Sequence, residues 1–206
     1  MKITAMKIIA IKIIAPFLLG LLVFAPGSRV VAESRSFVLD SDHLSIAFLV
    51  DHIGYQRQIG QFLEANGSFV YNPETNDLSS GEVIVTADSV FTNHDRRDRH
   101  LRNDDFLNVS DYPDIRYVIT GHQGGEGDQH RVEGELTLLG RTRPVTLNVT
   151  LNKAADYPFG HENFTLGLSA RTTIRRSEWG MDYGLSGDLV GDEVELWFEF
   201  EAIAED

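Results

Sequence analysis

Apolar and polar residues alternate along much of this chain. Residues 193 to 201 read EVELWFEFE, and every second position carries one apolar series: Val194, Leu196, Phe198 and Phe200. The positions between them carry glutamate, with Trp197 as the exception. Successive side chains of a strand point to opposite faces, so this period of two predicts a strand with one buried face and one face in water.

The same alternation recurs in further segments, at residues 44–50, 83–87, 115–119, 131–138, 145–152 and 164–174. Residues typical of turns separate them, at 72–74, 124–128, 139–141 and 186–188. About eight to ten short strands joined by tight turns predict an antiparallel barrel or sandwich. The inward positions combine bulky residues with the small Ala87, Gly134 and Gly167, which suits a hollow barrel and tapered packing equally.

One segment, residues 94–107, breaks the alternation. It contains the charged run RRDRHLRNDDF and ends on the apolar pair Phe106 and Leu107. Asn93 or Asp95 could cap the start of a helix. Two acid–base pairs have the i, i+4 spacing of ion pairs on a helix, Asp95–Arg99 and Asp98–Arg102. With Leu101 as its apolar anchor, this segment is expected to form a salt-bridged helix at one end of a barrel.

The charged run also offers atoms for a metal site or for catalysis, and neither interpretation fits well. The candidate metal ligands are His94, Asp95, Asp98 and His100, whose spacing differs from the i, i+4 histidine pair of a zinc-binding helix. The arginines between them would repel a cation. The chain has no cysteine and no serine in a nucleophile motif, so we expect no metal ion, no cofactor and no catalytic residue.

The first part of the chain differs from the rest in composition. Three lysines precede an apolar run at residues 13–25, and the small residues at 30–32 suit a cleavage site. This order is typical of a secretory signal peptide, and an uncleaved membrane anchor is the alternative. The apolar run is short for a span and is interrupted by proline and glycine. We therefore expect residues 1–32 to be removed and residues 33–206 to form a single domain.

The net charge of the mature domain excludes some classes of binding partner. The whole chain has a formal net charge of −13, and the loss of four basic residues with the leader lowers it to −17. A domain of this charge repels nucleic-acid backbones, so we expect no nucleic-acid partner. Without cysteine the fold depends on hydrophobic burial alone, which is compatible with an exported protein of the bacterial periplasm.

Several motifs resemble one known family. The segments TNHDRRDRHLRNDDFLNVSDYPDIRY (92–117), HLSIAFLVDHIGYQRQIGQF (43–62) and GELTLLGRTRPVTL (134–147) are similar to motifs of the YceI-like family of periplasmic polyisoprenoid-binding proteins. YPFG, RRSEWGM and GDEVEL resemble its carboxyl-terminal part. The resemblance covers nearly the whole mature chain, in order.

The resemblance implies an all-β fold, an extended lipocalin-like antiparallel barrel of about eight strands with the short helix near one end. It also implies a long isoprenoid lipid as the ligand, held in an apolar tunnel and carrying a quinone, phenol or phosphate head. The expected function is storage or transport of that lipid in the periplasm, without a catalytic step.

The inward apolar positions are our candidates for the tunnel lining. They are Ile46, Phe48, Val50, Phe62, Val83, Val85, Ile115, Tyr117, Leu136, Leu147, Val149, Phe164, Leu166, Leu168, Leu196, Phe198 and Phe200. His52 shares the parity of Phe48 and Val50, so it is a candidate polar contact for a quinone or phenol oxygen, with Tyr55 nearby. Each of these residues could equally serve the packed core.

Two other functions stay open at this point. A lipid-modifying enzyme would need a buried acid–base pair, for which His52 and Asp51 are weak candidates because adjacent strand residues face opposite ways. An interaction module without a ligand, such as a partner of a membrane redox protein, would have a well-filled core. Trp197 on the polar face is compatible with a homodimer contact, although single exposed aromatic residues are common.

Overall fold

The computed structural model describes residues 33–124 and 127–205. The expected signal peptide, residues 1–32, lies outside the described residues. The described part contains these strands: β1 (Arg35–His52), β2 (Gln56–Phe62), β3 (Ala65–Asn72), β4 (Asp77–Thr86), β5 (Val90–Phe91), β6 (Asp114–Gly124), β7 (Gln129–Leu138), β8 (Arg141–Asp156), β9 (Phe164–Arg175) and β10 (Val190–Ala204). It also contains the helix α1 (Asp95–Leu101) and two short 3₁₀ helices, η1 (Ala87–Ser89) and η2 (Arg176–Trp179).

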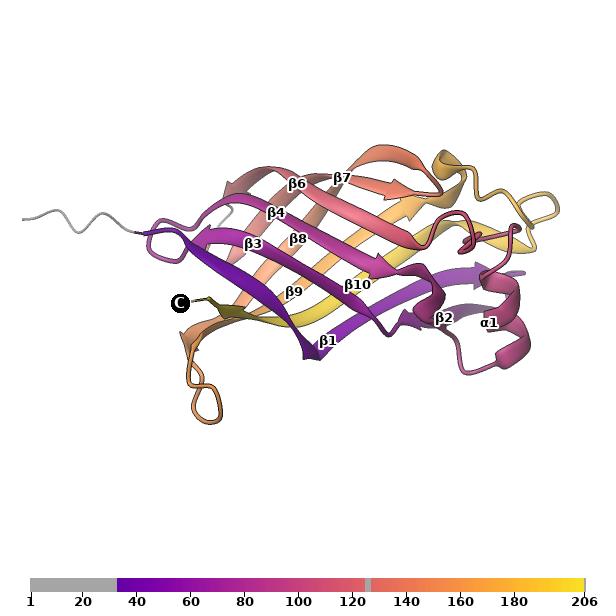
Figure 1. The fold of residues 1–206 in the computed structure, drawn as a ribbon. Coiled ribbons are helices and arrows are strands. Elements are labelled where there is room, and N and C mark those ends of the chain that lie inside the picture. The colour runs from indigo at the N-terminus through magenta and orange to yellow at the C-terminus, as the bar shows by residue number, and fades with distance from the viewer. Residues whose placement is uncertain (1–32, 125–126, 206) are drawn as a thin grey trace, which may run out of the picture. The chain divides into compact units, whose positions relative to one another are not determined.

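Eight of these strands close into an antiparallel barrel (Figure 1). Around the barrel the order is β1, β3, β4, β6, β7, β8, β9 and β10, and β10 pairs back with β1. The closing register aligns Phe37 with Ala204 and Phe48 with Leu196. Closure leaves the barrel strands without a free edge, so the expected barrel is confirmed.

The long strand β1 changes partner along its length. Its first half pairs with β3 and its second half with β2, while β10 follows it on the other side. Between Leu39 and Leu44, β1 forms a bulge, because this stretch lies opposite a much shorter stretch of β10. The bulge bends β1 and separates its two halves. As a result the β1–β2 hairpin extends beyond the barrel wall at the same end as α1 (Figure 1).

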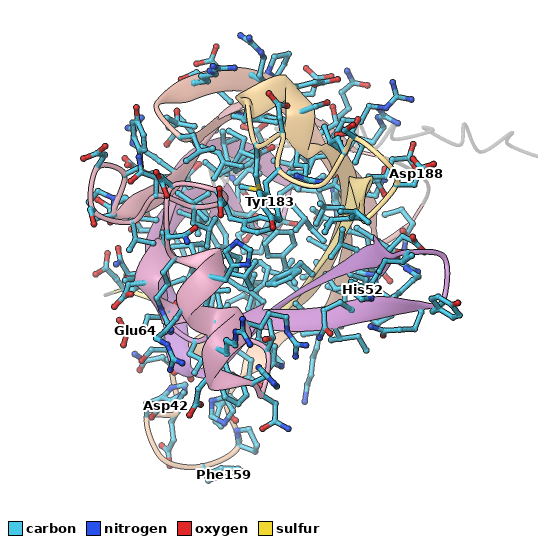
Figure 2. The ribbon with its side chains drawn as sticks, turned by 90° about the vertical axis from the view of Figure 1, so that its right-hand side faces the viewer. Asp42, His52, Glu64, Phe159, Tyr183 and Asp188 are labelled. Carbon is cyan, nitrogen blue, oxygen red and sulfur yellow. The ribbon has the colours of Figure 1, made fainter. Side chains whose placement is uncertain are left out.

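The turn of this hairpin has an unusual residue. Ile53 (φ 56°) and Gly54 (φ 67°) both have left-handed backbones, and the Tyr55 N–H donates to the His52 carbonyl at 3.0 Å. This is the geometry of a two-residue hairpin turn in which asparagine is usual at the first position. Figure 2, which looks at this end of the barrel, shows the hairpin with His52 beside α1 and the loop of Tyr183 and Asp188.

The charged segment forms a shorter helix than predicted, with a different cap. α1 ends at Leu101, and turns continue the segment as far as residue 111. The cap is His94, whose Nδ1 accepts the Arg97 N–H at 3.2 Å, so the expectation of Asn93 or Asp95 was wrong. Asn93 instead has a left-handed backbone (φ 60°), which turns the chain into the helix.

The two predicted ion pairs within the helix are not formed in the described part of the chain. Asp98 is buried and accepts the Thr92 N–H at 2.9 Å. Arg102 points out of the helix, pairs with Asp88 at 2.9 Å and donates to the Val90 carbonyl at 2.8 Å. The charges of this run therefore fasten the helix to the neighbouring β4–β5 segment, which is a structural role.

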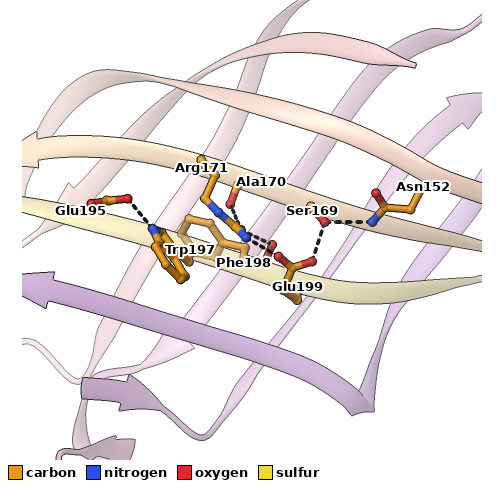
Figure 3. A network of polar contacts seen from close by, with 8 residues as sticks. All are labelled: Asn152, Ser169, Ala170, Arg171, Glu195, Trp197, Phe198 and Glu199. Carbon is orange, nitrogen blue, oxygen red and sulfur yellow. Dashed lines mark hydrogen bonds and ion pairs between the residues drawn. The ribbon is translucent and has the colours of Figure 1, made fainter. Parts of the chain in front are cut away.

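Polar contacts link side chains of β8, β9 and β10 on the outer side of the barrel (Figure 3). Across β9 and β10, Arg171 pairs with Glu199, and Ser169 donates to the same carboxylate. The guanidinium of Arg171 also lies 4.9 Å from the ring centre of Trp197, whose indole N–H donates to Glu195. Trp197, the exception in the alternation, is thus held by partners in its own chain.

Candidate binding cavity

A continuous cavity of about 580 Å³ lies inside the barrel. All eight barrel strands contribute side chains to its wall, and so do β2, α1 and the loop before β10. The wall is made mostly of Leu, Val, Ile and Phe side chains. A volume in this range is typical of pockets that enclose a small organic ligand.

The cavity reaches the surface at the α1 end. Three of its lining residues are also well exposed there: Ile53 (45%), Tyr183 (44%) and Leu189 (47%). They come from the β1–β2 hairpin and from the loop before β10; in Figure 2 the hairpin with His52 lies to the right of α1 and Tyr183 lies above the helix. The opening is therefore rimmed by apolar side chains from segments that are distant in sequence.

All but two of the residues predicted to line a tunnel do line this cavity. They are Ile46, Phe48, Val50, His52, Phe62, Val83, Val85, Ile115, Tyr117, Leu136, Leu147, Val149, Leu166, Leu168, Leu196, Phe198 and Phe200. Their contact with a ligand stays a prediction, but the structure does bring them together around one space.

The two exceptions, Tyr55 and Phe164, lie elsewhere. Tyr55 is 88% exposed, because it follows the hairpin turn and projects away from the barrel. Phe164 packs 6.4 Å from the ring of Phe37, beyond the wall of the cavity at the end away from α1. A further correction concerns Gly167, which falls between the cavity-lining Leu166 and Leu168 and therefore on the outer side of β9.

Two glycines allow aromatic rings to lie flat against the inner wall. A Cβ atom on Gly60 would stand 2.1 Å from the ring of Phe48, and one on Gly134 would stand 2.3 Å from the ring of Tyr117. The Tyr117 hydroxyl lies 3.0 Å from the Val145 carbonyl, two strands away. Because these rings cover the wall rather than cross the lumen, the barrel interior stays hollow.

Sequence reasoning missed a histidine pair in the cavity. His122 and His130 both line it, with His122 Nε2 3.1 Å from His130 Nδ1. His130 shares the parity of Val132 and Leu136, a signal that was present in the alternation of β7. His122 had no such signal, because an irregularity between Ile119 and Gly121 shifts the parity of β6.

The arginine and histidine of α1 that reach the cavity are already engaged. Arg97 donates to the Thr92 hydroxyl and to the Thr92 carbonyl, both at 2.7 Å. His100 Nε2 lies 2.8 Å from Asp105. Arg97 and His100 form a polar edge at the opening, and these hydrogen bonds join them to other residues of the protein.

Asp51 and His52, the acid–base pair considered for an enzyme, both border the cavity. The Asp51 carboxylate accepts the Gly54 N–H at 2.9 Å and so serves the hairpin turn. Tyr117 is partly buried, and this burial raises the pKa of its hydroxyl well above the ordinary value.

One group of side chains outside the cavity has atoms that could hold a metal ion. At the bulge of β1, ligand atoms of Asp40, His43 and Glu201 lie within 4.8 Å of one another. His43 Nδ1 is 2.7 Å from the Asp40 carboxylate, and this contact lowers the pKa of Asp40 and raises that of His43. His43 and Asp40 therefore form an ion pair when His43 is protonated, with the Glu201 carboxylate 3.7 Å from His43 Nδ1, and of the three residues His43 is the exposed one.

The geometry defines a class of protein: a closed antiparallel barrel around an apolar cavity that opens at one end, beside α1. No helix among the described residues is long and apolar enough to cross a membrane. The chain belongs to the YceI-like family, because residues 37–202 match the model of the YceI-like domain. This confirms the family suggested by the sequence motifs.

Relatives and solved structures agree with this assignment. The chain is 33% identical over 189 residues to Protein YceI of Salmonella arizonae, covering 91% of this chain and 95% of that protein. The barrel is similar to BcnA of Burkholderia cenocepacia (TM-score 0.70, 19% identity, 79% of this chain and 98% of that chain). It is also similar to a polyisoprenoid binding domain from Saccharophagus degradans (TM-score 0.61, 15% identity, 83% and 99%).

Proposed function

We propose that this protein binds a long-chain isoprenoid lipid in the barrel cavity and stores or carries it in the periplasm without altering it chemically. The continuous apolar cavity, which opens at the α1 end, carries this proposal. The name of the Saccharophagus domain, which binds polyisoprenoid, supports the choice of ligand class.

The energetics of such a lipid match the cavity. A polyprenyl chain exposes a large apolar surface, and each 100 Å² removed from water contributes about 2.5 kcal/mol before the costs of ordering. An apolar wall with few polar groups supplies this contribution along the whole chain of the ligand. Because such a lipid is insoluble in water, its movement between membranes requires an enclosing carrier.

The cavity favours this function over an interaction module without a ligand. Such a module is expected to fill its barrel with side chains, whereas the rings of Phe48 and Tyr117 lie against the wall and leave the space open. A membrane redox partner or a second copy of the chain would then be a recipient or companion of the carrier. Export to the periplasm rests on the leader pattern of residues 1–32.

The proposal is tested by isolating the protein with its natural ligand. The full chain is expressed in a bacterium and the mature form is purified from the periplasm without detergent. An organic extract is then analysed by mass spectrometry. We expect a polyprenyl species at close to one molecule per protein.

A variant that fills the cavity provides the matched comparison. Ala170 is buried on β9 and lines the cavity, whereas Thr173 on the same strand is exposed. Ala170→Phe is expected to lose the lipid, and Thr173→Phe is expected to keep it. An empty extract from the unmodified protein, repeated after incubation with membrane lipids, would refute the proposed function.

A further inference from the structure

The histidine pair lies at the end of the cavity away from α1. His122 is near the carboxyl end of β6, and its Nδ1 lies 3.4 Å from the backbone nitrogen of Leu78 at the start of β4. The other end of β4 leads through η1 and β5 to α1. The pair therefore places polar atoms in the apolar wall far from the opening.

The contacts determine which nitrogen carries each proton. The Leu78 N–H can only donate, so His122 Nδ1 must accept and the proton of a neutral His122 sits on Nε2. That Nε2–H donates to His130 Nδ1 at 3.1 Å, which leaves the proton of a neutral His130 on its own Nε2. This second Nε2–H has no acceptor among the described residues.

His130 is held in the neutral form. The residue is only 7% exposed, and burial, followed by the neighbouring His122, lowers its pKa. Asp128 acts in the opposite direction as a smaller effect. The Tyr71 hydroxyl, which belongs to another residue that lines the cavity, donates its proton to Asn76 in a hydrogen bond of 2.8 Å. The inner end of the cavity therefore presents the His130 Nε2–H as an uncharged hydrogen-bond donor.

We propose that His130 Nε2–H is the anchor for a neutral oxygen of the ligand, such as a quinone carbonyl, and that the lipid head lies at the inner end with its tail toward α1. This inference rests on the proposed lipid-binding function and adds the chemical class of the head. A neutral donor in an apolar wall satisfies a carbonyl oxygen, whereas a phosphate would bring a charge to a wall in which the described lining residues of this end include no lysine or arginine.

The test compares three probes of equal chain length with the delipidated mature protein. They are a prenylated benzoquinone, a prenyl hydrocarbon without oxygen and a prenyl phosphate. Binding is followed by fluorescence of Trp179, which is buried in the cluster packed beside the cavity. The variants are His130→Phe, which removes the donor, and His52→Phe, which removes the histidine at the opening.

We expect His130→Phe to weaken quinone binding about tenfold or more, since a buried carbonyl is left without a donor. Its affinity for the hydrocarbon should stay within about twofold. The infrared carbonyl band of the bound quinone should shift to higher frequency in the same variant, an effect that a merely structural role of His130 would not produce. His52→Phe should leave that band unchanged.

Other outcomes overturn the inference and separate it from the proposed function. An equal loss for quinone and hydrocarbon, a quinone-specific loss in His52→Phe instead, or tightest binding of the phosphate would each refute the role of His130 while leaving lipid binding intact. Failure of the unmodified protein to bind any probe would refute the proposed function itself.

Discussion

Replacing Arg176 by methionine tests how the opening of the cavity is held together. Arg176 is 2% exposed and donates three hydrogen bonds to carbonyl groups of the segment that borders the opening. Its acceptors are Met181 at 2.6 Å, Gly191 at 2.7 Å and Val190 at 2.8 Å. Methionine keeps most of the apolar stem and removes all three donors.

The magnitude follows from these contacts. Each buried carbonyl left without a donor costs about 1–3 kcal/mol. Part of this loss is offset, because the guanidinium is desolvated in the folded state, as its lowered pKa indicates. We expect the free energy of unfolding to fall by about 3–5 kcal/mol. At a urea m value of about 2 kcal/mol/M, the unfolding midpoint would move down by about 1.5–2.5 M.

Urea unfolding followed by circular dichroism measures this change, and the adjacent arginine is the control. Arg175 and its partner Glu193 are both mostly exposed and stand 3.8 Å apart, so Arg175→Met should cost less than about 0.5 kcal/mol. If Arg176→Met also cost less than about 1 kcal/mol, the three bonds would not hold this segment and the reasoning would be refuted.

Three further predictions concern the barrel and its helix. Gly134→Ala should push the Tyr117 ring into the lumen, which lowers lipid affinity with only a modest loss of thermal stability. Asp98→Asn should cost about 1–2 kcal/mol in urea unfolding, because the bonds from Thr92 lose their charged acceptor. Since the pKa of His130 is lowered from 6.5, the unfolded chain binds its proton at higher pH than the folded chain does. Stability should therefore fall on acidification below about pH 6.5, by up to about 1.4 kcal/mol per pH unit, and His130→Phe should remove this part of the decline.

The alternation predicted which side chains face inward wherever a strand runs without irregularity. Every residue proposed for the tunnel lining on β4, β7, β8 and β10 does line the cavity. The alternation gives the wrong face where the register of a strand shifts, as it does before His122. Such a bulge cannot be recognised from the order of apolar and polar residues. It also fails at strand ends, where Phe164 keeps the correct parity but lies past the cavity.

The partners of the charged helix could not be read from helical spacing. Spacing along one helix captures only local pairs, whereas Arg102 reaches the Val90 carbonyl and Asp98 holds Thr92 in the preceding segment. The hollow interior could not be predicted from the sequence either. It depends on which glycine of one strand lies beneath an aromatic ring of the neighbouring strand. The pairing of Gly60 with Phe48 follows from the register of the β1–β2 hairpin and cannot be read from either strand alone.

Ile53 offers a final test, in which stability and function should move in opposite directions. A branched residue in the left-handed region, here at φ 56°, costs about 1–2 kcal/mol, and asparagine adopts that backbone more readily. Ile53→Asn should therefore raise the thermal unfolding midpoint by about 2–4 °C.

The same change removes an apolar side chain from the opening of the cavity, so binding of a prenylated quinone should weaken. Thermal unfolding and ligand titration of one preparation measure both effects. A lowered midpoint would mean that the packing of Ile53 outweighs its backbone strain. A raised midpoint with unchanged affinity would mean that the strained residue is not kept for the ligand. Only the combination of higher stability and weaker binding supports the view that the hairpin keeps its strain to place an apolar residue at the opening.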